Sequence, residues 1–140
     1  MPPEWTELTS EDGFLYCYKC EVLRVVDGDT VDINLNLGCN VVFKVRTRLI
    51  GIDAPEMRGD EKEKGKDARD HLVKLCCRYS LNLRKEGKFS GNAKMYVRTH
   101  KDKQGSFGRY LVELVGLDSY DNIVVINQKM VEDGHAVSSL

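Results

Sequence analysis

The chain has 140 residues, of which 41% are hydrophobic and 31% are charged. This composition is typical of a folded globular chain, and the length suits one domain with a single core. No apolar run approaches the roughly 20 residues of a membrane-spanning helix, so we expect no membrane partner. Lysine and arginine total 21 against 22 acidic residues, which gives a net charge of −1. A uniformly basic nucleic-acid binder is therefore excluded, whereas a local basic patch is not.

Residues 1–13 are acidic and polar and contain no apolar stretch of the kind that secretory signals carry. We predict a flexible N-terminal arm there, followed by a single domain over residues 14–140. The odd number of cysteines, five, suits free thiols in a reducing compartment, although the localisation stays open. Cys17 and Cys20 form a C-x-x-C pair inside a predicted strand. Residues three apart in a strand face opposite sides, which disfavours a zinc site.

The first half of the chain predicts three strands. Residues 14–26 form an apolar run that ends at an Asp-Gly turn signal. Residues 30–37 alternate between apolar and polar side chains, which is typical of a half-buried strand. A third strand over 41–52 must end before Pro55, because proline cannot continue the sheet. Residues 57–66 are charged and contain two glycines, so we expect a loop.

Helical periodicity begins after this loop. Apolar side chains recur at helical spacing over 66–78, and residues 80–93 read mainly as a loop. Three further strands are expected over 94–100, 109–115 and 123–126. A short helix over 128–133 would begin at Asn127 as the N-cap and end at Gly134. Short strands joined by tight turns, with a helix after the third strand, predict a small OB-like barrel.

Acidic side chains follow two of the predicted strands at sharp turns. Asp29 lies in VVDGDT, and Asp53 and Glu56 lie in RLIGIDAPE. Carboxylates on adjacent strand ends suit a hard divalent cation, and a third acid can orient or deprotonate water. Arg48, in an apolar strand, and Arg109, after a glycine, would bind an anion beside the cation. The alternative is that the acids only make turn hydrogen bonds and that Arg48 pairs with Glu56.

Four motifs together resemble one known family. VVDGDTVDI, RLIGIDAPE, FGRYLVEL and NQKMVEDGHA follow one another in this order over residues 15–137. The set resembles the thermonuclease family of staphylococcal nuclease-like domains. The resemblance implies a β-dominated α+β fold, a five-stranded OB-fold-like barrel with a helix after strand 3 and a short C-terminal helix. It also implies calcium-dependent hydrolysis of DNA and RNA that releases 3′-phosphate products.

The resemblance assigns the cation to three positions of this sequence. Asp29 and Asp53 would supply side-chain ligands for calcium, and Ala54 would supply its backbone carbonyl. Oxygen ligands alone also suit magnesium, which stays open as the alternative cation.

The resemblance also assigns the catalytic roles. Glu56 would act as the general base or would orient the attacking water. Arg48 and Arg109 would clamp the scissile phosphate and stabilise the charge of the transition state. A non-catalytic nuclease-like module that binds nucleic acid or a partner protein is the alternative function.

A basic stretch is the expected contact with nucleic acid. Residues 84–109 hold eight lysines and arginines against two acids, although a solvated loop face would have the same composition. Within it, Ser106 and Phe107 stand where the family often has a Lys-Tyr pair, and Lys101 and Lys103 precede them. We expect these four residues to contact DNA or RNA, preferably single-stranded, and the protein to act as a monomer.

Overall fold

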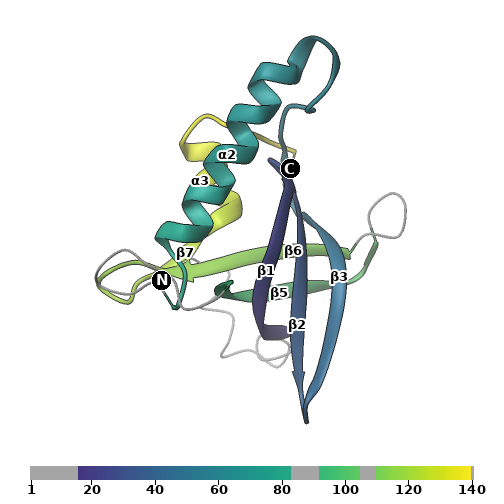
Figure 1. Ribbon diagram of the computed structural model, residues 1–140, viewed down its shortest axis with the longest axis vertical. Helices are drawn as coiled ribbons and strands as arrows, with labels where there is room; N and C mark the ends of the chain where they lie inside the picture. The colour runs from purple at the N-terminus through teal and green to yellow at the C-terminus, as the bar shows by residue number, and fades with distance from the viewer. Residues whose placement is uncertain (1–15, 83–91, 105–109, 140) are drawn as a thin grey trace.

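The computed structural model describes residues 16–82, 92–104 and 110–139, without the side chains of 101–104. The predicted arm over 1–13 and most of the predicted loop over 80–93 lie outside the described residues. Figure 1 shows a barrel of strands with two helices packed at one end. In chain order, the elements are β1 (Cys17–Asp27), β2 (Thr30–Gly38), β3 (Val41–Leu49), β4 (Ile52–Asp53), the 3₁₀ turn η2 (Gly59–Glu61), α2 (Lys62–Arg78), β5 (Ala93–Gln104), β6 (Tyr110–Leu117), β7 (Ile123–Val125), α3 (Ile126–Glu132) and β8 (Val137–Ser138).

Five strands close into a barrel. The strand order is β3-β2-β1-β5-β6 with antiparallel neighbours, and β7 extends the sheet beyond β6. A parallel pairing of β3 with β6 closes the ring, with Thr47 opposite Tyr110 and Leu49 opposite Val112. The predicted OB-fold-like barrel, with a helix after its third strand and a short C-terminal helix, is therefore confirmed.

Periodic side chains build the core. The predicted alternation in β2 buries Val31, Ile33 and Leu35 inside the barrel. On α2, Leu72 and Leu75 are buried at helical spacing and belong to the same core, and the helix lies at one end of the barrel (Figure 1). Neither helix has the length and apolar character needed to cross a bilayer, and the described residues contain no other candidate.

The helix α2 begins earlier than predicted. The predicted loop over 57–66 is wrong in its second half, because the helix starts at Lys62 rather than at residue 66. Gly65 lies inside the helix, where a Cβ would stand 2.2 Å from the carbonyl oxygen of Glu56. This glycine therefore permits a close backbone approach and does not mark a loop.

The third predicted strand is also divided. β3 ends at Leu49, and Gly51 turns the chain with a φ of 82°. The next two residues form β4, which pairs with β8 near the end of the chain. These two-residue strands carry no periodicity, so the sequence gives no signal for them.

Asn127 does not cap α3, contrary to the prediction. The helix begins at Ile126, two residues earlier than predicted, and the side chain of Asn127 is buried. Its Oδ1 accepts from the amide of Leu114 at 3.0 Å, and its Nδ2 donates to the carbonyls of Ile50 and Val112 at 2.9 and 3.0 Å. Asn127 therefore joins α3 to β6 and to the segment after β3.

Replacing Asn127 with leucine should lower the free energy of unfolding by at least about 2 kcal/mol, because the amide of Leu114 and the carbonyl of Ile50 lose their partner, whereas the carbonyl of Val112 still accepts from the amide of Ile50. Urea unfolding measures this loss. The control is Gln128→Leu, the same change at the adjacent exposed position, which should cost less than about 1 kcal/mol. Equal costs for the two variants would contradict the bridging role of Asn127.

The C-terminal end of α3 follows the prediction. Gly134 has a φ of 81°, and its amide donates to the carbonyl of Val131 at 3.1 Å. The amide of His135 donates to Met130 at 3.0 Å. This pair of bonds is the Schellman motif that glycine favours.

A buried carboxylate joins β5 to β6. Glu113 Oε1 accepts from Arg98 Nη2 at 2.8 Å and lies 2.8 Å from His100 Nε2. Burial raises the pKa of Glu113, but the hydrogen bonds from His100 and Arg98 outweigh it, so the pKa lies below its ordinary value. The folded protein therefore holds this proton more weakly than the unfolded chain does.

This lowered pKa predicts a loss of stability in acid. The contribution of Glu113 to the free energy of unfolding is complete at pH values above its pKa in the unfolded chain. It disappears as the pH falls through its pKa in the folded protein. Urea unfolding from about pH 6 to about pH 3.5 should show a steeper loss for the native protein than for Glu113→Gln. The exposed Glu63→Gln variant serves as the control and should keep the native slope. A Glu113→Gln variant with the native slope would refute this assignment.

Candidate functional site

The β1–β2 turn and the end of β3 meet at one end of the barrel. In the β2–β3 register Thr30 stands opposite Arg48, so the turn residue Asp29 comes next to the end of β3. The amide of Leu49 donates to the carbonyl of Asp29 at 2.8 Å and fixes this contact. β4 follows within a few residues and brings Asp53 to the same place.

Arg48 lies between the two aspartates. Its Nη2 forms an ion pair with Asp53 Oδ1, lies 3.7 Å from Asp29 Oδ2, and donates to the carbonyl of Ile52 at 3.3 Å. The structure thus brings Asp29 of the β1–β2 turn to Arg48 and Asp53, two predicted site residues from a separate part of the chain. We call Asp29, Arg48 and Asp53 the acid–arginine cluster.

Asp29 is the enclosed acid of this cluster. Its side chain is only 13% exposed, and it accepts from the amide of Ala54 at 3.0 Å and from Thr30 Oγ1 at 3.1 Å. Burial and the neighbouring Asp27 carboxyl raise the pKa of Asp29 to about 6, against the Ala54 amide and Arg48, which lower it. The ionised form of Asp29 is therefore less stable than that of an ordinary aspartate, and a bound cation would stabilise it.

Three small residues, Gly28, Ala54 and Ala68, let the turn approach α2 and the start of the next loop closely. A Cβ on Gly28 would stand 2.6 Å from Ala54 Cβ and 2.7 Å from Ala68 Cβ on α2. Gly28 is therefore needed for the packing of the turn against the helix, whereas the sequence suggests only a bend. Asp27 was also not among the predicted site residues, although its Oδ1 accepts from the amide of Asp29 at 3.0 Å.

Glu56 lies outside the acid–arginine cluster. Its side chain is 69% exposed, and its Oε2 lies 3.6 Å from Arg58 Nε. In the described part of the chain, no hydrogen bond or ion pair joins its side chain to the cluster. The alternative pairing of Arg48 with Glu56 is not observed either, because Arg48 pairs with the two aspartates.

The remaining predicted site residues are not placed. Lys101 and Lys103 belong to β5, but their side chains are not described. Outside the described residues lie Ser106, Phe107 and Arg109. The strand that follows them, β6, begins beside the part of β3 that carries Arg48.

The donors of the cluster suit a hard cation but do not complete its coordination. Asp29 and Asp53 offer carboxylate oxygens, which Ca²⁺ and Mg²⁺ prefer. Across the described residues, no three His, Cys, Asp or Glu side chains gather closely enough to hold an ion. A cation here would therefore also need backbone, water or phosphate oxygens, and such an incomplete set leaves room for an anionic ligand.

Comparisons with known proteins give one partial match. No protein-family model matches the chain. The chain is similar to Protein ParB from Escherichia coli, with 35% identity over 71 residues. The matched region covers 51% of this chain and 32% of ParB, about a third of that protein's length. This similarity is too partial to show the family of the chain.

Proposed function

We propose that this protein hydrolyses phosphodiester bonds of DNA or RNA, preferably single-stranded, with the help of calcium. The observation that carries the proposal is the position of Arg48 between Asp29 and Asp53 near the C-terminal end of β3. The order of its motifs, which resembles the thermonuclease family, supports the same reaction. The confirmed barrel supplies the rigid frame on which such a site depends.

The two aspartates and the carbonyl of Ala54 would hold the cation, with magnesium as the alternative to calcium. When bound, the cation stabilises the negative charge that grows on the phosphate during the reaction. The side chain of Asp53 is 53% exposed and therefore accessible to an ion from solvent.

Arg48 would bind the scissile phosphate. Its side chain is 28% exposed and carries a planar guanidinium that donates to two oxygens at once. Arg48 and Asp53 now form an ion pair with each other. In the complex, the phosphate would replace Asp53 as the partner of Arg48, and the cation would replace Arg48 as the partner of Asp53. We propose Arg109 as a second guanidinium on the same phosphate.

Glu56 would accept a proton from the attacking water at its carboxylate. The water oxygen forms a bond to phosphorus, the bond from phosphorus to the 5′-oxygen breaks, and that oxygen takes up a proton. The product strand then carries a 3′-phosphate. This role requires the side chain of Glu56 to leave Arg58 and turn towards the cluster.

The test is a cleavage assay on end-labelled single-stranded DNA and RNA with Ca²⁺, with Mg²⁺ and with a chelator. We expect cleavage with Ca²⁺, no cleavage with the chelator, and 3′-phosphate ends on the products. The exposed, Arg58-paired Glu56 favours one alternative, a non-catalytic module that only binds nucleic acid or a partner protein. Binding without cleavage under every condition would support that alternative and contradict the proposal.

A further inference from the structure

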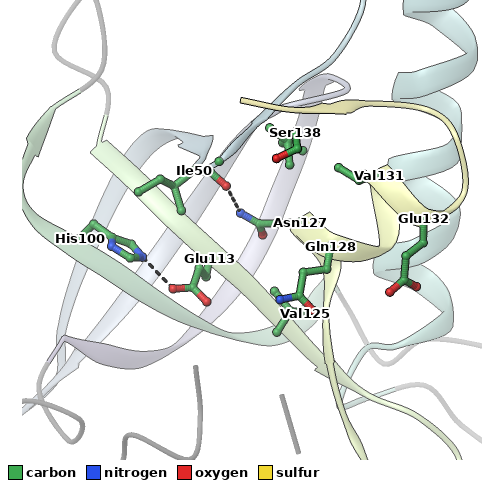
Figure 2. A pocket seen from close by; sticks show the side chains of 11 residues that line it. Ile50, His100, Glu113, Val125, Asn127, Gln128, Val131, Glu132 and Ser138 are labelled. Carbon is green, nitrogen blue, oxygen red and sulfur yellow. Dashed lines mark hydrogen bonds and ion pairs between the residues drawn. The ribbon is translucent and has the colours of Figure 1, made fainter. Parts of the chain in front are cut away.

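A cavity of about 460 Å³ lies beside the segment that joins β3 to β4. It is bounded by this segment, His100 of β5, β6, β7, α3 and Ser138 of β8 (Figure 2). Ile50, Ile52, Val125 and Val131 make most of its wall apolar. The volume falls in the range of roughly 300–1,000 Å³ that small-molecule sites occupy.

One buried polar atom faces this cavity without a partner. Glu113 is 6% exposed, and its Oε1 takes all the hydrogen bonds from Arg98 and His100. Its Oε2 is buried and has no hydrogen-bond partner among the described residues. Figure 2 shows this oxygen directed away from the His100 ring, towards the α3 side of the cavity. A buried acceptor without a partner is costly, so a ligand that donates to it would gain affinity.

Among the wall residues, His100 bonds to Oε1 of Glu113, and Oε2 is left without a partner in the described part of the chain. Asn127 lines the cavity, but its amide already bonds to three backbone groups. Glu132 adds a second carboxylate, and no lysine or arginine stands among the described residues of the wall. Arg98, which balances Glu113, contacts the opposite oxygen. The cavity therefore combines an apolar surface with an acidic end.

We propose that this cavity binds a small apolar molecule that carries an ammonium group. The ammonium donates to Glu113 Oε2, and the apolar body packs against Val125 and Val131. A single carboxylate oxygen without a partner suits the compact ammonium, whereas the fork of a guanidinium is best matched by two carboxylate oxygens side by side. This inference does not depend on the proposed nuclease activity.

The test compares two probes of nearly equal shape, 2-phenylethylamine, which is an ammonium at neutral pH, and the uncharged 2-phenylethanol. NMR titration of the whole protein gives both dissociation constants and locates the shifts. The amine should bind at least about tenfold tighter than the alcohol, because its hydrogen bond to the carboxylate is charge-assisted at both ends. Glu113→Gln should remove this preference. Equal affinity of the two probes, or no binding of the amine, would overturn the proposal.

A second pair of variants keeps the proposal testable if Glu113→Gln does not fold. Val131→Phe fills the cavity from α3 and leaves the carboxylate in place. It should weaken binding of the amine at least about tenfold, because the added ring takes the space of the ligand. Val73→Phe makes the same change at an exposed position of α2 outside the cavity wall and should leave binding unchanged. Unchanged binding in Val131→Phe would place the amine elsewhere and refute the proposed site.

Discussion

Replacing Arg48 with lysine should lower the rate of single-stranded DNA cleavage by about 10²–10³-fold, the typical effect of removing one preorganised charge-stabilising donor. Lysine keeps the positive charge but presents it as a point, so it cannot donate to two phosphate oxygens in parallel. Single-turnover cleavage with saturating protein separates this loss from a change in binding.

The matched control is Arg46→Lys. Arg46 lies two residues earlier on β3, is largely exposed, and pairs with Asp32 at 2.8 Å. This variant should cleave at the native rate, because its ion pair lies on the surface and contributes little to stability. If Arg48→Lys cleaved as fast as Arg46→Lys, the proposal that Arg48 clamps the phosphate would be contradicted.

Replacing Glu56 with glutamine should lower the cleavage rate by about 10²–10⁴-fold, the range that a positioned general base contributes. Glutamine keeps the shape of the side chain but cannot take the proton of the attacking water. Because Glu56 is 69% exposed, the variant should keep the native stability in urea. Glu63→Gln, at an exposed position of α2, is the control and should keep full activity.

The Glu56→Gln variant also tests whether the Glu56 side chain acts at the acid–arginine cluster or only pairs with Arg58. The structure pairs its side chain with Arg58 and not with the acid–arginine cluster. Full cleavage by Glu56→Gln would show that this pairing is its only role and would remove it from the mechanism. A loss confined to substrate affinity would likewise exclude Glu56 as the base.

The barrel was predictable because its strands carry a strong periodic signal. The alternation in β2 and the helical stripe of α2 each reflect one buried face, and the structure shows both, although Leu37 at the end of the β2 alternation is exposed and α2 begins earlier than predicted. The meeting of Asp29, Arg48 and Asp53 was predictable from their places at strand ends, since the barrel brings these ends together. The motif resemblance then assigned roles that periodicity alone does not provide.

Other features had no local signal. Asn127 has the sequence context of an N-cap, but its buried amide forms tertiary hydrogen bonds instead. Gly65 suggests a loop, whereas it lies inside α2 to let the helix approach the carbonyl of Glu56. The unsatisfied oxygen of Glu113 depends on which side chains surround it in three dimensions. Tertiary packing decides each of these cases, and a window of neighbouring residues cannot report it.

The central claim is that Asp29, Arg48 and Asp53 form one site for a cation and a phosphate. The most direct test is the Ca²⁺ concentration that gives half-maximal cleavage of single-stranded DNA, measured for the native protein and for Asp53→Asn. We predict saturable activation by Ca²⁺, no activity with a chelator, and a half-maximal concentration at least about tenfold higher in Asp53→Asn, because a charged ligand is lost. Cleavage that persists with the chelator, or an unchanged half-maximal concentration in the variant, would contradict the claim.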